Sequence, residues 1–385
     1  HGAGDATNGV YPRNTNYLEQ NGCFSNNSTA NAGCHGNNAG NRPTNAKDIY
    51  THYAKTYKHN VALATKVHSS MESQATNSGA FSGVNRHVEC ADCHNPHYDK
   101  PGTHTAPTNT ISNVLLGQWG VEPTYGAGAW AAPTSYAVTN FTAGVGKEYQ
   151  LCHKCHSSFA YGITPPVGFT DQSIELNPNN KAAHPVHVGL NSQTGSVAPK
   201  LLVAAQMTAP WATTLGTQVM YCSDCHGQDA ATDPQGPHGG SSQYMLNGPD
   251  RYWPKNAALA YYTLGNNNAT DAHLSGLFCR QCHPLRAAAS NTWYNNAHQE
   301  HSGAQVGNVP CVACHVVVPH GSRRGRLIGY SSELAPYNAN GAGATEKLVL
   351  LGFKKAASRT TYADTNCYST VSACNVHSNA GGYDP

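Results

Sequence analysis

The sequence has no long hydrophobic run and few charges. Its longest largely apolar run covers residues 348–353, far short of the roughly 20 residues that a membrane-spanning helix needs. Charged residues make up 11% of the chain and the formal net charge is +2, against about 25% charged residues in typical domains. The sequence therefore offers neither a membrane span nor the extended basic face that nucleic acids require.

Large apolar side chains are also scarce. The hydrophobic fraction is 39% even with tyrosine counted, with only 7 Phe and 4 Met against 38 Gly. Such a chain can bury little side-chain surface to offset the conformational entropy lost on folding. We therefore expect the interior to be filled by something other than the chain's own side chains.

What the chain does have is a recurring C-x-x-C-H pattern, at residues 90–94, 152–156, 222–226, 279–283 and 311–315. This pattern is typical of covalent haem c attachment. Two thiols three residues apart lie on one side of a helical turn, and the following histidine offers an imidazole to the iron. A zinc knuckle, a redox pair or a disulfide needs no histidine at that position, so a zinc-binding structural protein is a weak alternative.

A sixth site is predicted near the N-terminus, where Cys23, Cys34 and His35 form C-x10-C-H. A disulfide between the two cysteines, or a link to the C-terminal cysteines, is the alternative, and the position of His35 favours the haem. Cys367 and Cys374 lack a following histidine, and we expect them to form a disulfide.

The predicted cofactor is therefore haem c, six per chain. The predicted thioether cysteines are Cys23, Cys34, Cys90, Cys93, Cys152, Cys155, Cys222, Cys225, Cys279, Cys282, Cys311 and Cys314. The predicted proximal iron ligands are His35, His94, His156, His226, His283 and His315.

The second axial ligand is predicted to be histidine, which is abundant (22 residues), whereas methionine is rare. Histidines next to proline or glycine are favoured, because such turns hold an imidazole rigidly. The predicted distal ligands are His59, His97, His184, His238, His301 and His320. Alternative candidates for the distal ligands are His52, His68, His87, His187, His273 and His298. His153 lies inside a C-x-x-C loop and is expected to be exposed.

For the fold class we expect a multihaem cytochrome c, mostly irregular coil with a few short α-helices and little β, wrapped around a chain of haems. Residues 1–385 are predicted to form one domain, with a haem-bearing region at 23–328 and a haem-free tail from about 334 to 385. The best helix candidates are residues 48–71, which lack Gly and Pro, and the shorter segment 200–207.

The chain resembles the multihaem c-type cytochromes exported by dissimilatory metal-reducing bacteria. The segments that carry the resemblance are residues 86–97, 148–156, 177–186, 221–227, 236–238, 311–315 and 318–322. In size, haem number and loop content it is similar to the hexahaem cytochromes that form extracellular nanowires. The resemblance implies bis-histidine haems in a continuous chain, and the x10 spacing and the tail with Cys367 and Cys374 depart from it.

The predicted function is extracellular electron transfer without enzymatic activity. The alternatives are a multihaem oxyanion or metal reductase with one substrate-accessible haem, although no C-x-x-C-K occurs, and a monomeric shuttle. Expected partners are further copies in a head-to-tail filament, redox partner cytochromes and extracellular electron acceptors. The chain is expected to be exported, with its signal peptide already removed, to the outer surface or alternatively the periplasm. A histidine such as His1, His52, His59 or His68 is a candidate to ligate a neighbouring subunit's iron.

Overall fold

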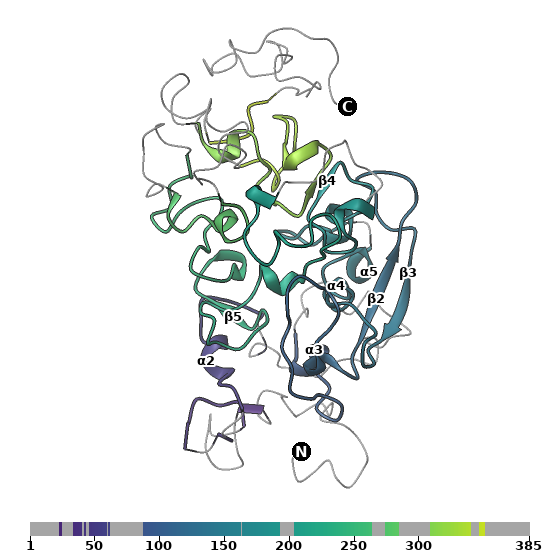
Figure 1. Ribbon diagram of the computed structural model, residues 1–385, viewed down its shortest axis with the longest axis vertical. Coiled ribbons are helices and arrows are strands. Elements are labelled where there is room, and N and C mark those ends of the chain that lie inside the picture. Colours follow the sequence, from purple (N-terminus) through teal and green to yellow (C-terminus); the bar gives the residue numbers. More distant parts are fainter. Residues whose placement is uncertain are drawn as a thin grey trace. The chain divides into compact units, whose positions relative to one another are not determined.

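The computed structural model describes residues 23–24, 34–40, 42–43, 46–59, 61, 88–162, 164–192, 204–263, 274–284, 309–339 and 346–350. The chain divides into two compact units that alternate along the sequence (Figure 1). The first unit takes in His1–Tyr125, Ala132–Ser173 and Met220–Pro249, and the second takes in Gly126–Ala131, Ile174–Val219 and Asp250–Pro385.

The first unit holds most of the regular structure. Its elements are α2 (Tyr50–Tyr53), β1 (Tyr57–Lys58), α3 (Cys90–Cys93), η3 (Asn113–Leu115), β2 (Trp119–Thr124), β3 (Ser135–Asn140), α4 (Glu148–His153), α5 (Ser158–Tyr161), η6 (Cys222–Asp224), β5 (Gly239–Gly240) and η7 (Gln243–Met245). Strands β2 and β3 form an antiparallel hairpin, and β1 pairs with β5.

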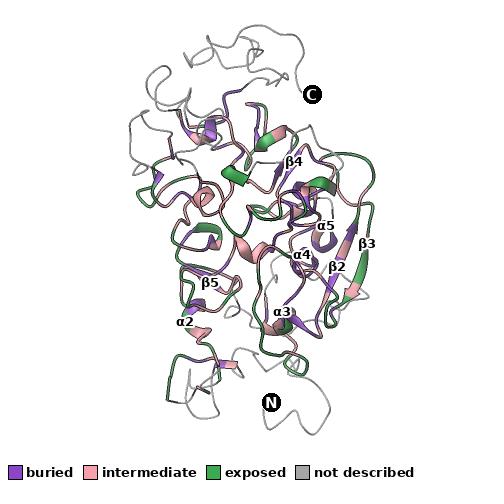
Figure 2. Cartoon of the chain, in the orientation of Figure 1, coloured by how far each residue is buried: buried purple, intermediate pink, exposed green. Residues whose placement is uncertain are grey.

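The hairpin supports helix α4, which carries the first cysteine of motif 152–156. Gly120 on β2 lies so close to α4 that an added Cβ would come within 2.6 Å of the Gln150 backbone. Only glycine permits this approach. Glu122, also on β2, accepts hydrogen bonds from Tyr149 (2.8 Å) and Gln150 (2.6 Å). Figure 2 shows buried residues along β2 and α4 and mainly exposed ones along β3.

The second unit consists of short turns joined by coil. Its elements are β4 (Ala182–Ala183), η4 (Leu190–Ser192), η5 (Ala204–Gln206), η9 (Phe278–Gln281), η12 (Cys311–Ala313), β6 (Gly321–Ser322) and η13 (Gly325–Leu327), and α6 (Gln172–Glu175) stands where the chain passes from the first unit into the second. Strand β4 pairs antiparallel with β6.

Each unit has a small apolar cluster, and each cluster includes a motif cysteine. In the first unit Cys93 packs against Ile111, Leu115, Leu116, Phe141 and Leu151. In the second unit Cys314 packs against Ile328, Tyr330 and Leu350. Further buried apolar residues, such as Tyr262 and Leu274, lie outside these two clusters.

The scarcity of regular structure is compatible with the expected coil-rich fold. The prediction of a helix over residues 48–71 is wrong in its described part, because α2 ends at Tyr53 and β1 follows at Tyr57–Lys58. Pairing of β1 with Gly239–Gly240 replaces helical hydrogen bonds there. Within 200–207, only Ala204–Gln206 is described as helical. No helix in the described ranges is long and apolar enough to cross a bilayer.

Candidate haem-binding sites

All six predicted attachment motifs share one backbone hydrogen bond. In each, the histidine N–H donates to the carbonyl of the motif's first cysteine. The N···O distances are 2.9 Å for His35, His94, His156, His226 and His283 and 3.0 Å for His315. In the five C-x-x-C-H motifs this bond closes a single backbone turn that contains both cysteines and ends at the histidine.

The motif with ten intervening residues keeps this geometry. His35 N–H bonds to the carbonyl of Cys23, although eleven residues separate them instead of three. Cys23 therefore occupies the place of the first cysteine in a C-x-x-C-H turn. The twelve described cysteines, Cys23 and Cys34 among them, carry thiols rather than disulfides. Cys367 and Cys374 lie outside the described residues.

Several motif thiols are poorly suited to thiolate chemistry, although Cys34 is exposed. Burial raises the pKa of Cys93 to about 12 and that of Cys279 to about 11. A hydrogen bond with the Cys222 thiol and burial raise the pKa of Cys152 as well. Redox-active Cys-x-x-Cys pairs depend on a lowered thiol pKa, so these environments do not favour that alternative. The contact between Cys152 and Cys222 also brings motifs 152–156 and 222–226 together.

The motif imidazoles are oriented through their Nδ1 atoms. His35 donates Nδ1–H to the carbonyl of Lys47 (3.1 Å), His94 to Val114 (2.9 Å), His226 to Tyr244 (2.7 Å) and His283 to Gln206 (3.2 Å). His156 differs, because the side-chain amide N–H of Gln172 donates to its Nδ1 at 3.3 Å. When Nδ1 carries the proton, Nε2 keeps its lone pair for a metal.

Two motif histidines of the first unit face a second imidazole. The ring centroids of His94 and His238 are 6.1 Å apart, and those of His59 and His156 are 6.0 Å apart. Two imidazoles on opposite sides of one metal, each with a metal–nitrogen distance of about 2.0 Å, have centroids roughly 6 Å apart. Both spacings fit one iron between two axial ligands.

The two opposing histidines sit side by side on one strand ladder. Lys58 of β1 pairs with Gly239 of β5, so His59 and His238 are the next residues across the ladder. His59 also donates Nδ1–H to the carbonyl of Pro237 at 2.8 Å. Burial, together with neighbouring imidazoles, lowers the pKa of His238 to about 3. His238 is therefore neutral, as a metal ligand must be.

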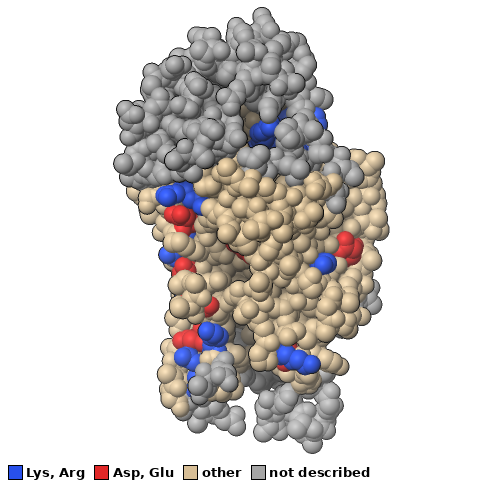
Figure 3. Space-filling model, in the orientation of Figure 1, with Lys and Arg blue, Asp and Glu red and all other residues tan. Residues whose placement is uncertain are grey.

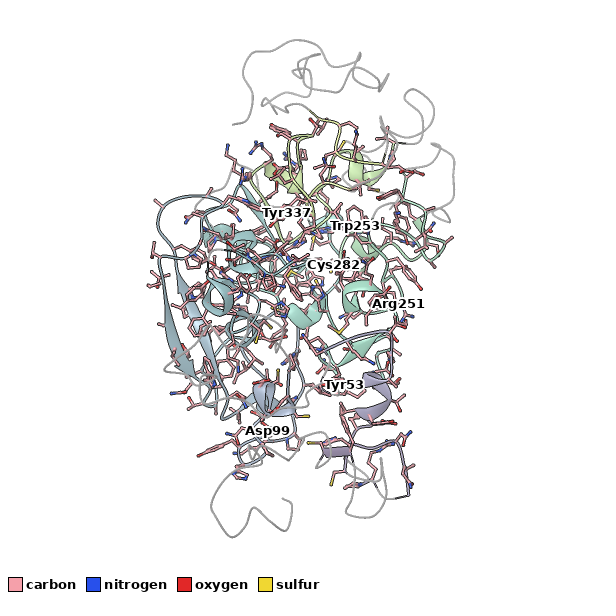
Figure 4. The ribbon with its side chains drawn as sticks, turned by 180° about the vertical axis from the view of Figure 1, so that it is seen from behind. Tyr53, Asp99, Arg251, Trp253, Cys282 and Tyr337 are labelled. Atoms are coloured by element: carbon pink, nitrogen blue, oxygen red, sulfur yellow. The ribbon has the colours of Figure 1, made fainter. Side chains whose placement is uncertain are left out.

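Tyr53 supports this histidine. Its ring meets the His238 ring edge-on at 5.9 Å, and it packs on Phe24, next to Cys23, at 5.7 Å (Tyr53 is labelled in Figure 4). An aromatic side chain thus ties the first motif cysteine to the ladder.

The second unit repeats the ladder. Ala183 of β4 pairs with Gly321 of β6, which sets His184 beside His320, and His184 N–H donates to the carbonyl of His320 (2.9 Å). His184 Nδ1–H donates to Pro319 at 2.6 Å, as His59 does to Pro237. Burial lowers the pKa of His184.

The similarity extends to the motif beside each ladder. Gly227 N–H bonds to Met245 and Asn247 N–H to Cys225, just as Val316 N–H bonds to Leu327 and Gly329 N–H to Cys314. Both units contain a kinked helical turn with two consecutive positive φ angles, at Tyr244 and Met245 in η7 and at Arg326 and Leu327 in η13. We call this arrangement of a motif, a turn and a two-histidine ladder the ladder module, and each unit holds one.

Sequence reasoning missed His104. Its Nδ1 lies 2.8 Å from Ser223 Oγ and 3.3 Å from Glu148 Oε2, and its ring stacks on Tyr221 at 4.4 Å. Its Nε2 is buried without a hydrogen-bond partner among the described residues, and burial lowers its pKa to about 4. A neutral imidazole held at Nδ1 with an unsatisfied Nε2 is what a buried metal ligand leaves when its metal is omitted. The threonines on either side of His104 do not mark it as a ligand in the sequence, because histidines beside Pro or Gly are favoured there.

The other histidines differ in setting. His97 is exposed in the turn after motif 90–94, while His52 is buried with its Nδ1 3.1 Å from Lys55 Nζ. Burial lowers the pKa of half-buried His187 to about 3. The expectation for His153 is wrong: it is 1% exposed, because α4 packs against β2. His68, His87, His273, His298 and His301 lie outside the described residues.

Comparisons with protein-family models, with curated proteins and with solved structures find no match for this chain. Its function is therefore argued from the motifs and their surroundings alone.

Proposed function

We propose that the chain is an electron-transfer protein that binds six haem c groups, each covalently attached and each ligated by two histidines. The observation that carries the proposal is the pair of imidazole spacings, 6.1 Å for His94 with His238 and 6.0 Å for His59 with His156. Both involve a motif histidine and a histidine from a distant part of the chain.

The residues present fit the cofactor. Two buried thiols, one anchored imidazole and a facing imidazole are the four protein groups that a bis-histidine haem c needs. Bound haem supplies a one-electron iron couple in which both axial positions are already filled. Because the histidines come from rigid turns and ladders, little reorganises when the charge on the iron changes.

The predicted haem sites of the first unit lie close to one another, which supports electron transfer from haem to haem rather than a set of isolated redox centres. His59 and His238 are neighbours on the β1–β5 ladder but face different motif histidines. The thiols of Cys152 and Cys222 are in contact. Motifs 90–94, 152–156 and 222–226 thus gather around the ladder of the first unit, and closely spaced macrocycles allow electrons to pass between them.

The proposed setting is outside the cytoplasmic membrane, at the outer surface, with the chain polymerised into a filament. On the face drawn in Figure 3, most of the described surface carries neither Lys or Arg nor Asp or Glu. A surface with few charges repels a second copy weakly. A head-to-tail contact between identical chains extends into a fibre unless its rotation closes a ring.

Carbon monoxide binding to the reduced, haem-loaded protein tests the proposal against the reductase alternative. With both axial positions filled by histidine, the ferrous absorbance spectrum should change little when the gas is added. A spectrum showing one fully carbon monoxide-bound haem would indicate an open iron and favour a reductase.

A further inference from the structure

The two ladder modules differ in the hydrogen-bond partner of one histidine, the residue that directly precedes strand β5 or β6. This residue is His238 in the first unit and His320 in the second. In the second unit His320 donates Nδ1–H to Glu175 Oε2 at 2.6 Å, and the Glu175 side chain is fully buried. The equivalent histidine of the first unit, His238, has a buried Nδ1 with no hydrogen-bond partner among the described residues. Nδ1 of this histidine therefore meets a carboxylate in the second unit and not in the first, although Asp229 lies against Gly240 of the first ladder.

Glu175 is held firmly in place. Its Oε1 accepts a hydrogen bond from Tyr337 Oη at 2.8 Å (Tyr337 is labelled in Figure 4), and its backbone carbonyl accepts one from Asn180 Nδ2 at 2.8 Å. That carbonyl also lies directly against Gly321. In the first unit the carbonyl against the corresponding Gly239 belongs to His52. Glu175 thus takes the place of His52 in the module.

A carboxylate on Nδ1–H changes how an imidazole binds iron. It draws the proton toward itself, which makes Nε2 a more basic ligand. A more basic ligand stabilises ferric iron over ferrous iron, and burial strengthens a charge-assisted hydrogen bond. Three other described histidines have a carboxylate within 4.0 Å, namely His94 with Asp99 at 3.5 Å, His104 with Glu148 at 3.3 Å and His52 with Asp233 at 4.0 Å. His94 and His104 each have a closer neutral partner on Nδ1, and His52 meets Asp233 through Nε2.

We propose that Glu175 is a positioning residue that lowers the reduction potential of the haem ligated by His320, relative to the haem ligated by His238. The inference rests on the proposed function. The two ladder modules would then hold electrons with different affinity, so the chain of haems would not be uniform in energy along its length.

The test uses the intact, haem-loaded Glu175→Gln variant in a spectroelectrochemical titration. One component should shift to higher potential by at least 59 mV, the equivalent of a tenfold change in a one-electron equilibrium constant, while the others stay in place. Glu122→Gln is the matched control, because Glu122 also accepts from a tyrosine, Tyr149, and its hydrogen bonds with Tyr149 and Gln150 involve no predicted iron ligand. The control should leave this low-potential component unchanged.

A folded, six-haem Glu175→Gln protein with an unchanged titration would overturn the role of Glu175. If the variant does not fold, the low-spin ferric electron paramagnetic resonance signals of the unaltered protein decide. One haem should then show a signal shifted toward that of imidazolate ligation, and uniform signals would contradict the inference. Failure of the proposed function is distinguishable, since the purified protein would then carry no covalent haem.

Discussion

A histidine can bind iron only through a nitrogen whose lone pair is available, and this requirement sorts the histidines of the chain. His59 and His184 donate Nδ1–H to prolyl carbonyls, and four motif histidines donate to other backbone carbonyls. These contacts fix both the tautomer and the direction of Nε2. Sequence identifies the residue type, but the carbonyl that orients it comes from a distant segment.

Replacing His238 by alanine should leave one iron five-coordinate. The variant's ferrous spectrum should show one carbon monoxide-binding haem that the unaltered protein lacks, because the imidazole 6.1 Å from His94 is removed. Added imidazole should restore the low-spin spectrum. A variant that keeps all haems low-spin without added imidazole would show that His238 is not an axial ligand.

His104→Ala tests the ligand that sequence reasoning did not find. Its buried, unsatisfied Nε2 predicts that the variant gains one high-spin, carbon monoxide-binding haem, measured by absorbance. Ser223→Ala is the control, since it removes the hydrogen bond at Nδ1 and leaves the ligand. Identical spectra for the two variants would assign His104 a packing role.

At the level of single residues, the motif cysteines and histidines can be read from sequence because their spacing is local. The distal ligands cannot be read in this way. His184 and His238 each stand next to Pro or Gly, whereas His104 lies between threonines and is recognised only by its buried environment. His97 is the opposite case, because it follows a proline and yet is exposed in the structure.

Among the elements, the ladders β1–β5 and β4–β6 position the predicted distal histidines, although each strand has only two residues. Sequence could not predict them, since a two-residue strand has no hydrophobic periodicity. The same limit explains the wrong helix over residues 48–71, where tertiary pairing overrides a favourable helical composition.

Gly321→Ala should disrupt the second ladder. An added Cβ would collide with the backbone carbonyl of Glu175, and relieving the collision would cost about 2 kcal/mol. Guanidinium unfolding of the haem-loaded protein measures this loss. Gly325→Ala is the matched control in the same turn region, because a Cβ there has nothing within 4 Å. Equal stabilities of the two variants would contradict the close approach.

Asp229 gives a prediction about pH. Burial alone would raise its pKa, but hydrogen bonds from Ser241 and the ammonium of Lys55, 2.9 Å away, outweigh burial and lower it to about 2. A lowered carboxyl pKa contributes stability that is complete above about pH 4 and is lost as the pH falls through 2.

Asp229→Asn should therefore reduce the free energy of unfolding at pH 7 by about 1 kcal/mol, a value discounted for solvent exposure. Unfolding in guanidinium at pH 7 and at pH 2 measures the difference. It should nearly vanish at pH 2, and a difference that persists there would assign the effect to amide packing rather than to charge.

For the whole molecule, composition predicts a coil-rich chain, and the scarcity of regular structure among the described residues is compatible with this. The division into two units, each with a ladder module, could not be predicted. The modules share hydrogen bonds and turn geometry, whereas their sequences outside the C-x-x-C-H and Pro-His-Gly segments differ. The repeat that is visible in the sequence is therefore limited to these segments, and backbone geometry preserves the rest of the arrangement.

Filament formation is a property of the intact chain. Electron microscopy of native, unsheared material should show fibres whose repeating unit is one chain, because few charges oppose self-association. Compact single particles at high concentration, with every haem already six-coordinate, would identify a monomeric shuttle.

The central claim, six covalent haems per chain, is tested most directly by the intact mass of the denatured native protein. The account predicts the mass of the polypeptide plus six haem groups, including one on Cys23 and Cys34, whose turn matches those of the other motifs. A mass with five haems and a Cys23–Cys34 disulfide would remove the sixth site. A mass equal to that of the bare polypeptide would contradict the account as a whole.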